Sequence, residues 1–414
     1  MSDHSEVQPV RPSRRMVILD ALRGFALLGI ALGNYPEFSL WAFLSESEQT
    51  MMPSAKADSV VHWLQCLLVD GKFYMVFSVL FGIGFTIIID RAMNRGANGF
   101  QIFYRRMTLL LLMGAAHMMF LWSGDILLLY AAIGMLLPLF RRCKERQLLY
   151  WAAFFLLLPV AVTLWRTMTG LDPAQWLYEQ WWSVAGEQGI NESNFASWLR
   201  DADSYGQVFS FLIQGAVERM WEFVGGQRYF KVLGLFLIGY YIGRRKIVQH
   251  LEEHRTLLNK VFMAGVLPGL PLSVFYALSS VHGRPWGTVT HEMLYAMSVY
   301  PLGLAYMAGL CLLYLKCRTW PCWRFLAYPG RMALSCYILQ SVFGIVLFYG
   351  IGFGWGTSIG FWQAELISLG VFALEIFLSF VWLRYFNFGL LEWIWRMLTY
   401  GKRFRLIKEN TEDK

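Results

Sequence analysis

Long runs of apolar residues, separated by short polar and charged stretches, recur along nearly the whole chain. A helix needs about 20 residues, within a range of roughly 17 to 25, to cross a hydrocarbon core of ~30 Å. The pattern therefore predicts ten membrane-spanning helices. They are expected at 16–36, 71–90, 105–123, 125–140, 147–168, 229–244, 260–280, 292–315, 328–350 and 361–384.

The composition supports this interpretation. Of the 414 residues, 57% are hydrophobic and 15% are charged, whereas a soluble domain has about 45–50% and about 25%. Such a chain cannot cover its surface with polar groups, so a water-soluble protein is excluded. The expected fold class is all-α, a polytopic integral membrane protein whose main partner is the lipid bilayer.

The basic residues predict how the chain is oriented. The net charge of +8 comes from 36 Lys and Arg that lie in short clusters between apolar runs, such as Arg141–Arg142 and Arg245–Lys246. Cytoplasmic loops of membrane proteins carry such clusters. We therefore expect both termini to lie in the cytoplasm, and no nucleic-acid partner. Residues 1–15 do not resemble a cleaved signal peptide.

The segment 204–224 is apolar enough to be considered as a further span. Counting it as a span would reverse the orientation of every later span and place the basic cluster at Arg244 on the outside. We therefore expect this segment to be a helix on the outer face. The predicted organisation has five parts. They are a cytoplasmic tail (1–15), a first half of five spans (16–168), an outer subdomain (169–228), a second half of five spans (229–386), and an amphipathic helix with a cytoplasmic tail (387–414).

Ionisable residues inside the first span are candidates for function, because charge is costly in a membrane. Asp20 and Arg23 lie three residues apart and could simply neutralise each other. Alternatively, Arg23 binds an anion at the cytoplasmic side, where Gly24 permits close approach of a helix or a ligand. Asn34 lies about 16 Å further along the same helix by helical rise.

The segment 105–142 predicts a helical hairpin with paired arginines at both inner ends. Its outer turn at Ser123–Gly124 is so short that His117 and Asp125 should lie close together. A histidine oriented by a carboxylate can act as a general base. Each residue also has a structural interpretation, His117 as a hydrogen-bonded packing residue and Asp125 as a helix N-cap. No spacing predicts a metal site.

Several motifs together resemble the YeiB-like family of bacterial inner-membrane proteins, a domain of unknown function. They are LDALRGFALLGI with Asn34, KFYMVFSVLFGIGF, HMMFLWSGDILLLYAAIG, GRMALSCYILQS and FGLLEWIWRMLTYG. One departure is Cys336, where the family commonly has Asn. The resemblance implies a location in the bacterial inner membrane.

This family is similar to heparan-α-glucosaminide N-acetyltransferase and the type-3 membrane acyltransferases, which implies a transmembrane acyltransferase fold. The shared LDxxRG start falls on Leu19, Asp20, Arg23 and Gly24. The catalytic histidine of the heparan enzyme lies after that segment, in the region where this chain has His62.

The first functional hypothesis is therefore a membrane acyltransferase. It would take an acyl group, expected to be acetyl, from cytoplasmic acyl-CoA and transfer it to an extracytoplasmic small-molecule acceptor. His117 and Asp125 would act on the acceptor. The donor's phosphates would bind arginines near the inner face, where the candidates are Arg23, Arg105, Arg106 and Arg331.

Two other hypotheses remain open. A transporter of a small anionic or amphipathic solute is suggested by Pro268 and Pro271, which would break the seventh span. A non-catalytic membrane protein with a ligand-binding outer subdomain is the third. A homo-oligomer is compatible with each of the three.

Overall fold

A computed structural model describes residues 16–94, 96 and 98–408, so the expected tail at 1–15 lies outside the described residues. The described chain is helical and contains no strand beyond an isolated bridge between Phe386 and Ile407, which confirms the all-α class. The helices are α1 (Val17–Phe38), α2 (Glu46–Met51), α3 (Ala55–Leu68), α4 (Lys72–Met93), α5 (Gly99–Phe120), α6 (Leu127–Gly134), α7 (Glu145–Thr169), α8 (Gln175–Glu187), α9 (Trp198–Asp201), α10 (Tyr205–Gly225), α11 (Arg228–Arg244), α12 (Arg255–Val281), α13 (Gly287–Lys316), α14 (Cys322–Arg331), α15 (Ala333–Phe348), α16 (Phe361–Tyr385) and α17 (Leu390–Tyr400).

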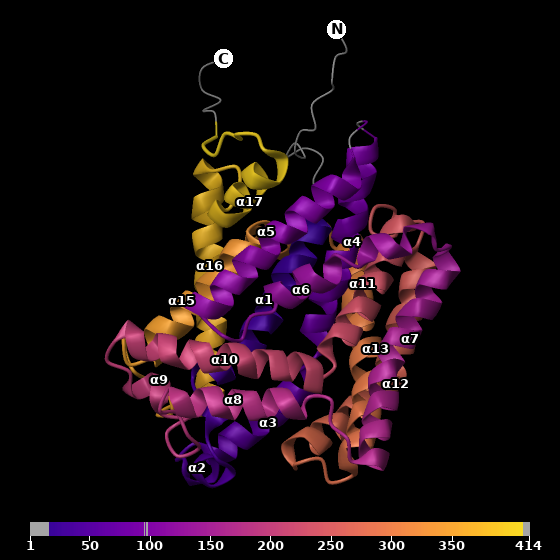
Figure 1. Cartoon of the computed structure of the whole chain (residues 1–414). Coiled ribbons are helices and arrows are strands. Elements are labelled where there is room, and N and C mark those ends of the chain that lie inside the picture. The colour runs from indigo at the N-terminus through magenta and orange to yellow at the C-terminus, as the bar shows by residue number, and fades with distance from the viewer. Residues whose placement is uncertain (1–15, 95, 97, 409–414) are drawn as a thin grey trace.

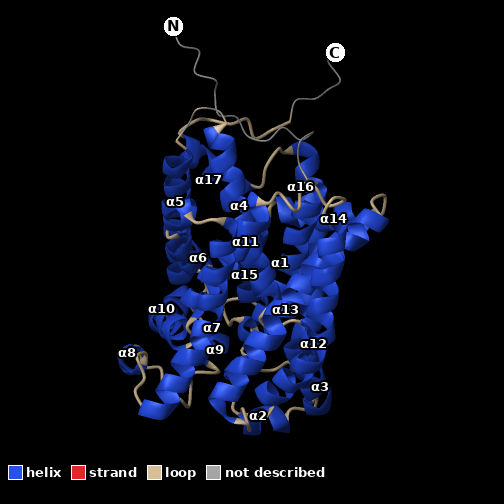
Figure 2. Cartoon of the chain, turned by 90° about the vertical axis from the view of Figure 1, so that its right-hand side faces the viewer, coloured by secondary structure: helices blue, strands red, loops and turns tan. Residues whose placement is uncertain are grey.

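The long helices form an upright bundle with two different ends. α17 lies at one end, together with the adjoining end of α16 (Figure 1). α2, α3 and α8 lie toward the opposite end, and a view from the side gives the same order (Figure 2). We refer to these as the α17 end and the α3 end.

Six helical segments are long and apolar enough to cross a membrane, and a seventh is added if a bent pair counts as one span. The six are Val17–Phe38, Ala55–Met93, Glu145–Thr169, Arg255–Val281, Gly287–Lys316 and Phe361–Tyr385. The bent pair is α14 and α15, whose axes meet at 83°. The helices thus have the length and composition of membrane spans, and the count of ten stays a prediction.

Of the four remaining expected spans, 105–123 lies mostly in the continuous 22-residue helix α5, and the other three are short or interrupted. The segment expected at 125–140 is the eight-residue helix α6, followed by a 3₁₀ helix from Leu137 to Arg142. α11 has only 17 residues, near the lower limit for crossing. The segment expected at 328–350 bends at Met332, between α14 and α15. Local hydropathy predicted one continuous helix at 125–140 and at 328–350 and did not detect these two interruptions, whereas α11 matches the helix expected at 229–244.

The predicted break of the seventh span at Pro268 and Pro271 is wrong. Both prolines lie inside α12, which continues for 27 residues. α12 packs along α13, where a Cβ on Gly265 would lie 2.3 Å from the Pro301 carbonyl oxygen. Neighbouring helices allow proline inside a membrane helix by stabilising the backbone around it.

The segment between the two halves is built from helices that run across the bundle. α8 and α10 lie side by side, roughly perpendicular to the long helices (Figure 1). α10 covers the segment predicted to lie on a membrane face and is not among the candidate spans. The indole of Trp181 on α8 hydrogen-bonds to Gln214 on α10, and both side chains are buried.

Glycines allow the central helices to touch backbone to backbone. A Cβ on Gly82 of α4 would lie 2.1 Å from the Phe236 carbonyl oxygen of α11, and one on Gly239 would lie 2.1 Å from that of Val79. At the α17 end, a Cβ on Gly24 of α1 would lie 1.8 Å from the Leu326 carbonyl oxygen of α14. Gly24 therefore serves helix packing here. Such contacts favour small residues in membrane helices.

We expect Gly82→Ala to destabilise the protein by about 1–3 kcal/mol, the usual cost of overpacking, because the added methyl group must push α11 away. Gly84 on the same helix has nothing within 4 Å of its Cβ position, so Gly84→Ala should be neutral or slightly stabilising. Thermal unfolding of both variants in detergent compares them. Equal melting temperatures would contradict the packing role of Gly82.

Candidate functional site

His117 is the centre of a buried chain of hydrogen bonds. Its Nδ1 lies 2.8 Å from Asp125 Oδ2, and its Nε2 lies 2.9 Å from Ser341 Oγ. His117 is 2% exposed, Asp125 0% and Ser341 1%. The structure therefore brings together the two residues that the hairpin spacing predicted and adds a serine from α15. Sequence reasoning missed Ser341, because no local pattern connects positions 224 residues apart.

Asp125 has two roles in this geometry. Its Oδ1 accepts a hydrogen bond from the Leu128 backbone N–H at 2.7 Å, in the first turn of α6, while Oδ2 faces His117. The N-cap interpretation and the histidine-orienting interpretation are thus both satisfied by one carboxylate. Because the cap holds the carboxylate in place, the imidazole has a defined partner at Nδ1.

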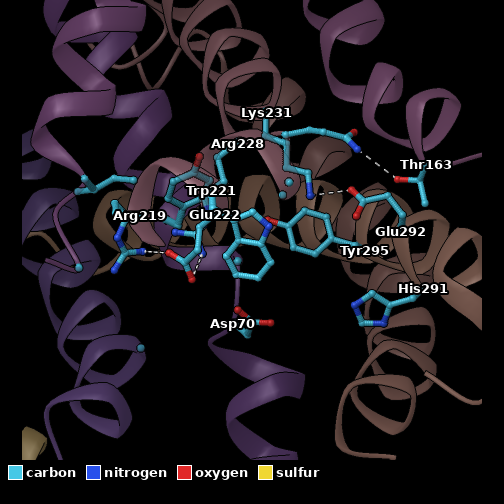
Figure 3. A pocket seen from close by; sticks show the side chains of 18 of the residues that line it. Asp70, Thr163, Arg219, Trp221, Glu222, Arg228, Lys231, His291, Glu292 and Tyr295 are labelled. Atoms are coloured by element: carbon cyan, nitrogen blue, oxygen red, sulfur yellow. Dashed lines mark hydrogen bonds and ion pairs between the residues drawn. The ribbon is translucent and has the colours of Figure 1, made fainter. Parts of the chain in front are cut away.

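A cavity of about 800 Å³ lies close to this chain, and Figure 3 shows part of its lining. The lining residues come from α1, α3, α4, α6, α7, α10, α11, α12, α13 and α15. Asn34, a predicted site residue, is part of its lining. The basic lining residues are Arg166, Arg219, Arg228, Lys231 and Arg284. The acidic ones are Glu37, Asp70, Asp172, Glu222 and Glu292. Five cations and five carboxylates give the wall no net charge.

Arg219 on α10 is the most connected of these charges. It forms ion pairs with Glu222 and, at 3.5 Å, with Glu37 of α1. Its Nε also donates to the Ser123 carbonyl oxygen at 2.9 Å, in the turn that precedes Asp125. With its side chain 7% exposed, Arg219 ties α10 to α1 and to the turn between α5 and α6. The crossing helix α10 thus positions the turn that carries Asp125.

A second group of charges lies across the cavity, as Figure 3 shows. Lys231 Nζ lies 2.7 Å from Glu292 Oε1 and 4.3 Å from the centre of the Tyr295 ring. Asp70 accepts a hydrogen bond from the Tyr276 hydroxyl. Paired charges and aromatic faces together can bind a polar, uncharged or zwitterionic molecule without leaving a charge unpaired.

Tyr337 connects the cavity with the buried hydrogen-bond chain. It is part of the cavity lining, and its ring centre lies 5.2 Å from that of His117. His117 and Ser341 do not line the cavity themselves. Tyr337, which lies one helical turn before Ser341 on α15, therefore borders both the cavity and His117.

Several arginines gather at the α17 end. Arg23 pairs with Asp20 at 2.8 Å, and Arg106 lies within electrostatic range of Arg23 and Arg396. Arg331 Nε and Arg396 Nη1 are buried and have no hydrogen-bond partner among the described residues. We call Arg23, Arg106, Arg331 and Arg396 the arginine cluster. Three of these four arginines were predicted from the sequence, and Arg396 was not.

Helix α17 holds this end together. Glu392 accepts hydrogen bonds from the Leu334 backbone N–H at 2.7 Å and the Ser335 hydroxyl at 2.6 Å, at the start of α15. The Trp395 indole donates to the Arg106 carbonyl oxygen at 3.0 Å and lies 3.5 Å beneath the Arg106 guanidinium. A carboxylate at a helix start is favourable because the helix dipole is positive there.

Two other candidates lie apart from these sites. Arg105 is exposed near Gly401, beside the arginine cluster but outside it. His62 packs against the rings of Trp41 and Phe361, with ring centres 5.4 and 5.0 Å away. The structure therefore places His62 in an aromatic contact and not with His117.

The fold is that of a helical membrane protein. Its buried Asp–His–Ser chain lies between a cationic end and a polar cavity. Residues 242–402 match the family described as "Protein of unknown function (DUF418)". "Uncharacterized protein YxaH" of Bacillus subtilis (strain 168) is 29% identical over 96% of this chain and 97% of its own. "Uncharacterized protein YeiB" of Escherichia coli (strain K12) is 28% identical over 93% of this chain and 96% of its own.

A third relative, "Uncharacterized 39.9 kDa protein in amylase 3'region" of Bacillus acidopullulyticus, is 28% identical over 98% of this chain and 100% of its own. No solved structure matches the chain significantly. The chain is thus similar to YeiB along nearly its whole length and matches the DUF418 family over residues 242–402, which confirms the resemblance seen in its motifs.

Glu218 on α10 predicts a pH dependence of stability. Burial raises the pKa of its carboxyl group from 4.5 to about 8, and the charges of Glu222 and Glu37 add to this while Arg219 opposes it. The folded protein therefore holds this proton more tightly than the unfolded chain, and stability falls as pH rises from about 4.5 to about 8.

Glu218→Gln cannot ionise, so its melting temperature should fall less over this pH range than that of the wild type. Thermal unfolding in detergent from about pH 5 to about pH 8 measures the slope. Glu187→Gln, at an exposed position at the end of α8, is the control and should keep the wild-type slope. An unchanged slope in Glu218→Gln would contradict the raised pKa.

Proposed function

We propose that the protein is a membrane acyltransferase that moves an acyl group, preferably acetyl, from cytoplasmic acyl-CoA to an acceptor on the other side of the membrane. The observation that carries the proposal is the position of the His117–Asp125 pair. It lies in the core between the arginine cluster and the polar cavity. Transfer across a membrane requires such a reactive centre, with the donor bound on one side and the acceptor on the other.

The proposal includes the ten-span arrangement with both termini in the cytoplasm of a bacterial cell and the chain in its inner membrane. The α17 end is then the cytoplasmic end, and α8 and α10 lie on the outer side. In its support, basic side chains gather at the α17 end, in accord with the positive-inside rule. The cavity would open toward the outer side and receive the acceptor.

The arginine cluster is the proposed donor site. The cluster contains four guanidinium groups, and only two carboxylates, Asp20 and Glu392, lie near them. This leaves an excess of positive charge. The buried nitrogens without partners on Arg331 and Arg396 would bind phosphate oxygens, since guanidinium groups pair with phosphates in a bidentate manner. From Arg106 to His117 the rise along α5 is about 16 Å, a distance that the extended arm of CoA would bridge.

His117 is the proposed general base. In this role Nδ1–H would donate to Asp125, and Nε2, which lies 2.9 Å from Ser341 Oγ, would be unprotonated and able to accept a proton. A positioned base contributes about 10²–10⁴-fold to the rate. Tyr337 would have to move for the acceptor to reach Nε2, and the closed arrangement excludes water from the acyl donor.

Acetyl-CoA should raise the melting temperature of the purified protein, because a ligand that binds only the folded state stabilises it, by about 2.7 kcal/mol at 100 times Kd. Arg23→Ala and Arg396→Ala should reduce this shift. Arg255→Ala, which removes an exposed arginine at the start of α12, should keep it. No shift with acetyl-CoA at millimolar concentration would count against the proposal.

Inside-out membrane vesicles that contain the protein should move labelled acetyl groups from acetyl-CoA into other molecules. Right-side-out vesicles should not, because the donor site faces the cytoplasm. His117→Ala should lower the transfer by about 100-fold or more while its melting temperature shows that it folds. Equal transfer by His117→Ala would refute its role as the base.

Transport of a small solute is a second candidate function, favoured by two buried carboxylates in α16. Glu375 accepts a hydrogen bond from Gln340 at 2.9 Å, and neither oxygen of Glu365 has a partner among the described residues. Buried carboxyl groups in spans often carry protons in transporters. Uptake that depends on a proton gradient and is lost in Glu375→Gln would favour transport over acyl transfer.

A further inference from the structure

Ser341 completes a chain of three groups, two of which come from one hairpin and the third from a distant part of the sequence. Asp125 precedes α6, His117 belongs to α5, and Ser341 lies in the middle of α15. The carboxylate faces Nδ1 of the imidazole, and the serine hydroxyl faces Nε2, at 2.8 and 2.9 Å. With Nδ1–H bonded to the carboxylate, Nε2 is the atom that accepts the serine proton, as in enzymes with a serine nucleophile.

A buried serine and histidine often only satisfy each other's hydrogen bonds. The surroundings of Ser341 indicate more than that. α15 begins beside the arginine cluster, and Ser341 lies about 12 Å along it by helical rise. Tyr337, one turn before Ser341, lines the cavity. Ser341 thus lies between the two regions from which donor and acceptor would arrive.

We propose that Ser341 is the nucleophile and carries the acyl group as an ester between two half-reactions. This inference rests on the proposed acyltransferase function and adds a covalent intermediate to it. Ser341 Oγ bonds to the thioester carbonyl carbon, and the carbon–sulfur bond breaks. The serine proton passes to His117 Nε2 and then to the sulfur of CoA, which leaves as the thiol.

The second half-reaction restores the enzyme. The acceptor's oxygen or nitrogen bonds to the acyl carbon while its proton passes to His117 Nε2. The bond between that carbon and Ser341 Oγ breaks, and the proton returns to the serine. Atoms balance without water, metal or oxidant, and CoA can leave before the acceptor arrives. Because Ser341 is 1% exposed, water would reach the ester slowly.

An exchange reaction without acceptor tests this intermediate. Purified full-length protein is mixed with acetyl-CoA and labelled free CoA, and the label in acetyl-CoA is followed with time. An acyl-enzyme makes this exchange possible, whereas direct transfer to an acceptor does not. We expect exchange by the wild type and a loss of about 100-fold or more in Ser341→Ala and His117→Ala.

Mass spectrometry of the protein treated with acetyl-CoA should locate one acetyl group on the peptide that contains Ser341. Ser341→Cys should retain acylation, because the thiol is also a nucleophile. The control is Ser368→Ala, which removes a buried hydroxyl of α16 that has no partner among the described residues. It should exchange and acylate as the wild type does. Melting temperatures identify variants that do not fold.

The outcomes separate the two proposals. If the wild type transfers acetyl groups in vesicles but shows neither exchange nor an acetylated Ser341, the intermediate is refuted and the acyltransferase stands. Full transfer by Ser341→Ala also refutes the role of Ser341 as the nucleophile. An acetyl group found on His117 instead of Ser341 does the same. Absence of acetyl-CoA binding and of transfer overturns both proposals.

Discussion

Close contact between helix backbones at glycine positions is the constraint on which the rest of the structure depends. In a membrane, apolar side chains gain little by leaving lipid for protein, so helices associate mainly through tight packing. Gly82 and Gly239 bring α4 and α11 together, and Gly24 with Gly330 does the same for α1 and α14. These contacts fix the distances between helices, and therefore which polar side chains can reach one another.

The polar groups inside the bundle are distributed in two ways. Around the cavity, cations and carboxylates pair off, as Lys231 does with Glu292 and Arg219 with Glu222. At the α17 end, arginines outnumber carboxylates, and buried nitrogens of Arg331 and Arg396 have no partner among the described residues. Pairing removes the cost of burying charge. An excess of unpaired donors is stable only where solvent or an anionic ligand can supply the missing partner.

The sequence predicted features that depend on neighbouring residues. Apolar runs identified the helices, and the short turn at Ser123–Gly124 predicted that His117 and Asp125 meet. Features that depend on distant parts of the chain were missed. Ser341 reaches His117 because α15 packs against α17, which in turn packs against α5. The cavity is lined by residues from ten helices.

The errors in the predicted helices arose because a local sequence pattern does not record how helices are arranged. Pro268 and Pro271 suggested a break because proline disturbs an isolated helix, but packing against α13 keeps α12 continuous. The sharp bend between α14 and α15 was missed because the two helices together have the length and hydropathy of a single span.

The Asp–His–Ser chain is divided between the two halves of the protein. His117 and Asp125 lie before residue 242, whereas Ser341, Arg331 and Arg396 lie within the DUF418 region at 242–402. Neither half contains all three members of the hydrogen-bond chain. An exchange of one half for another would keep the contact between His117 and Ser341 only if α15 kept its position relative to α5, so this single hydrogen bond makes each half depend on the other.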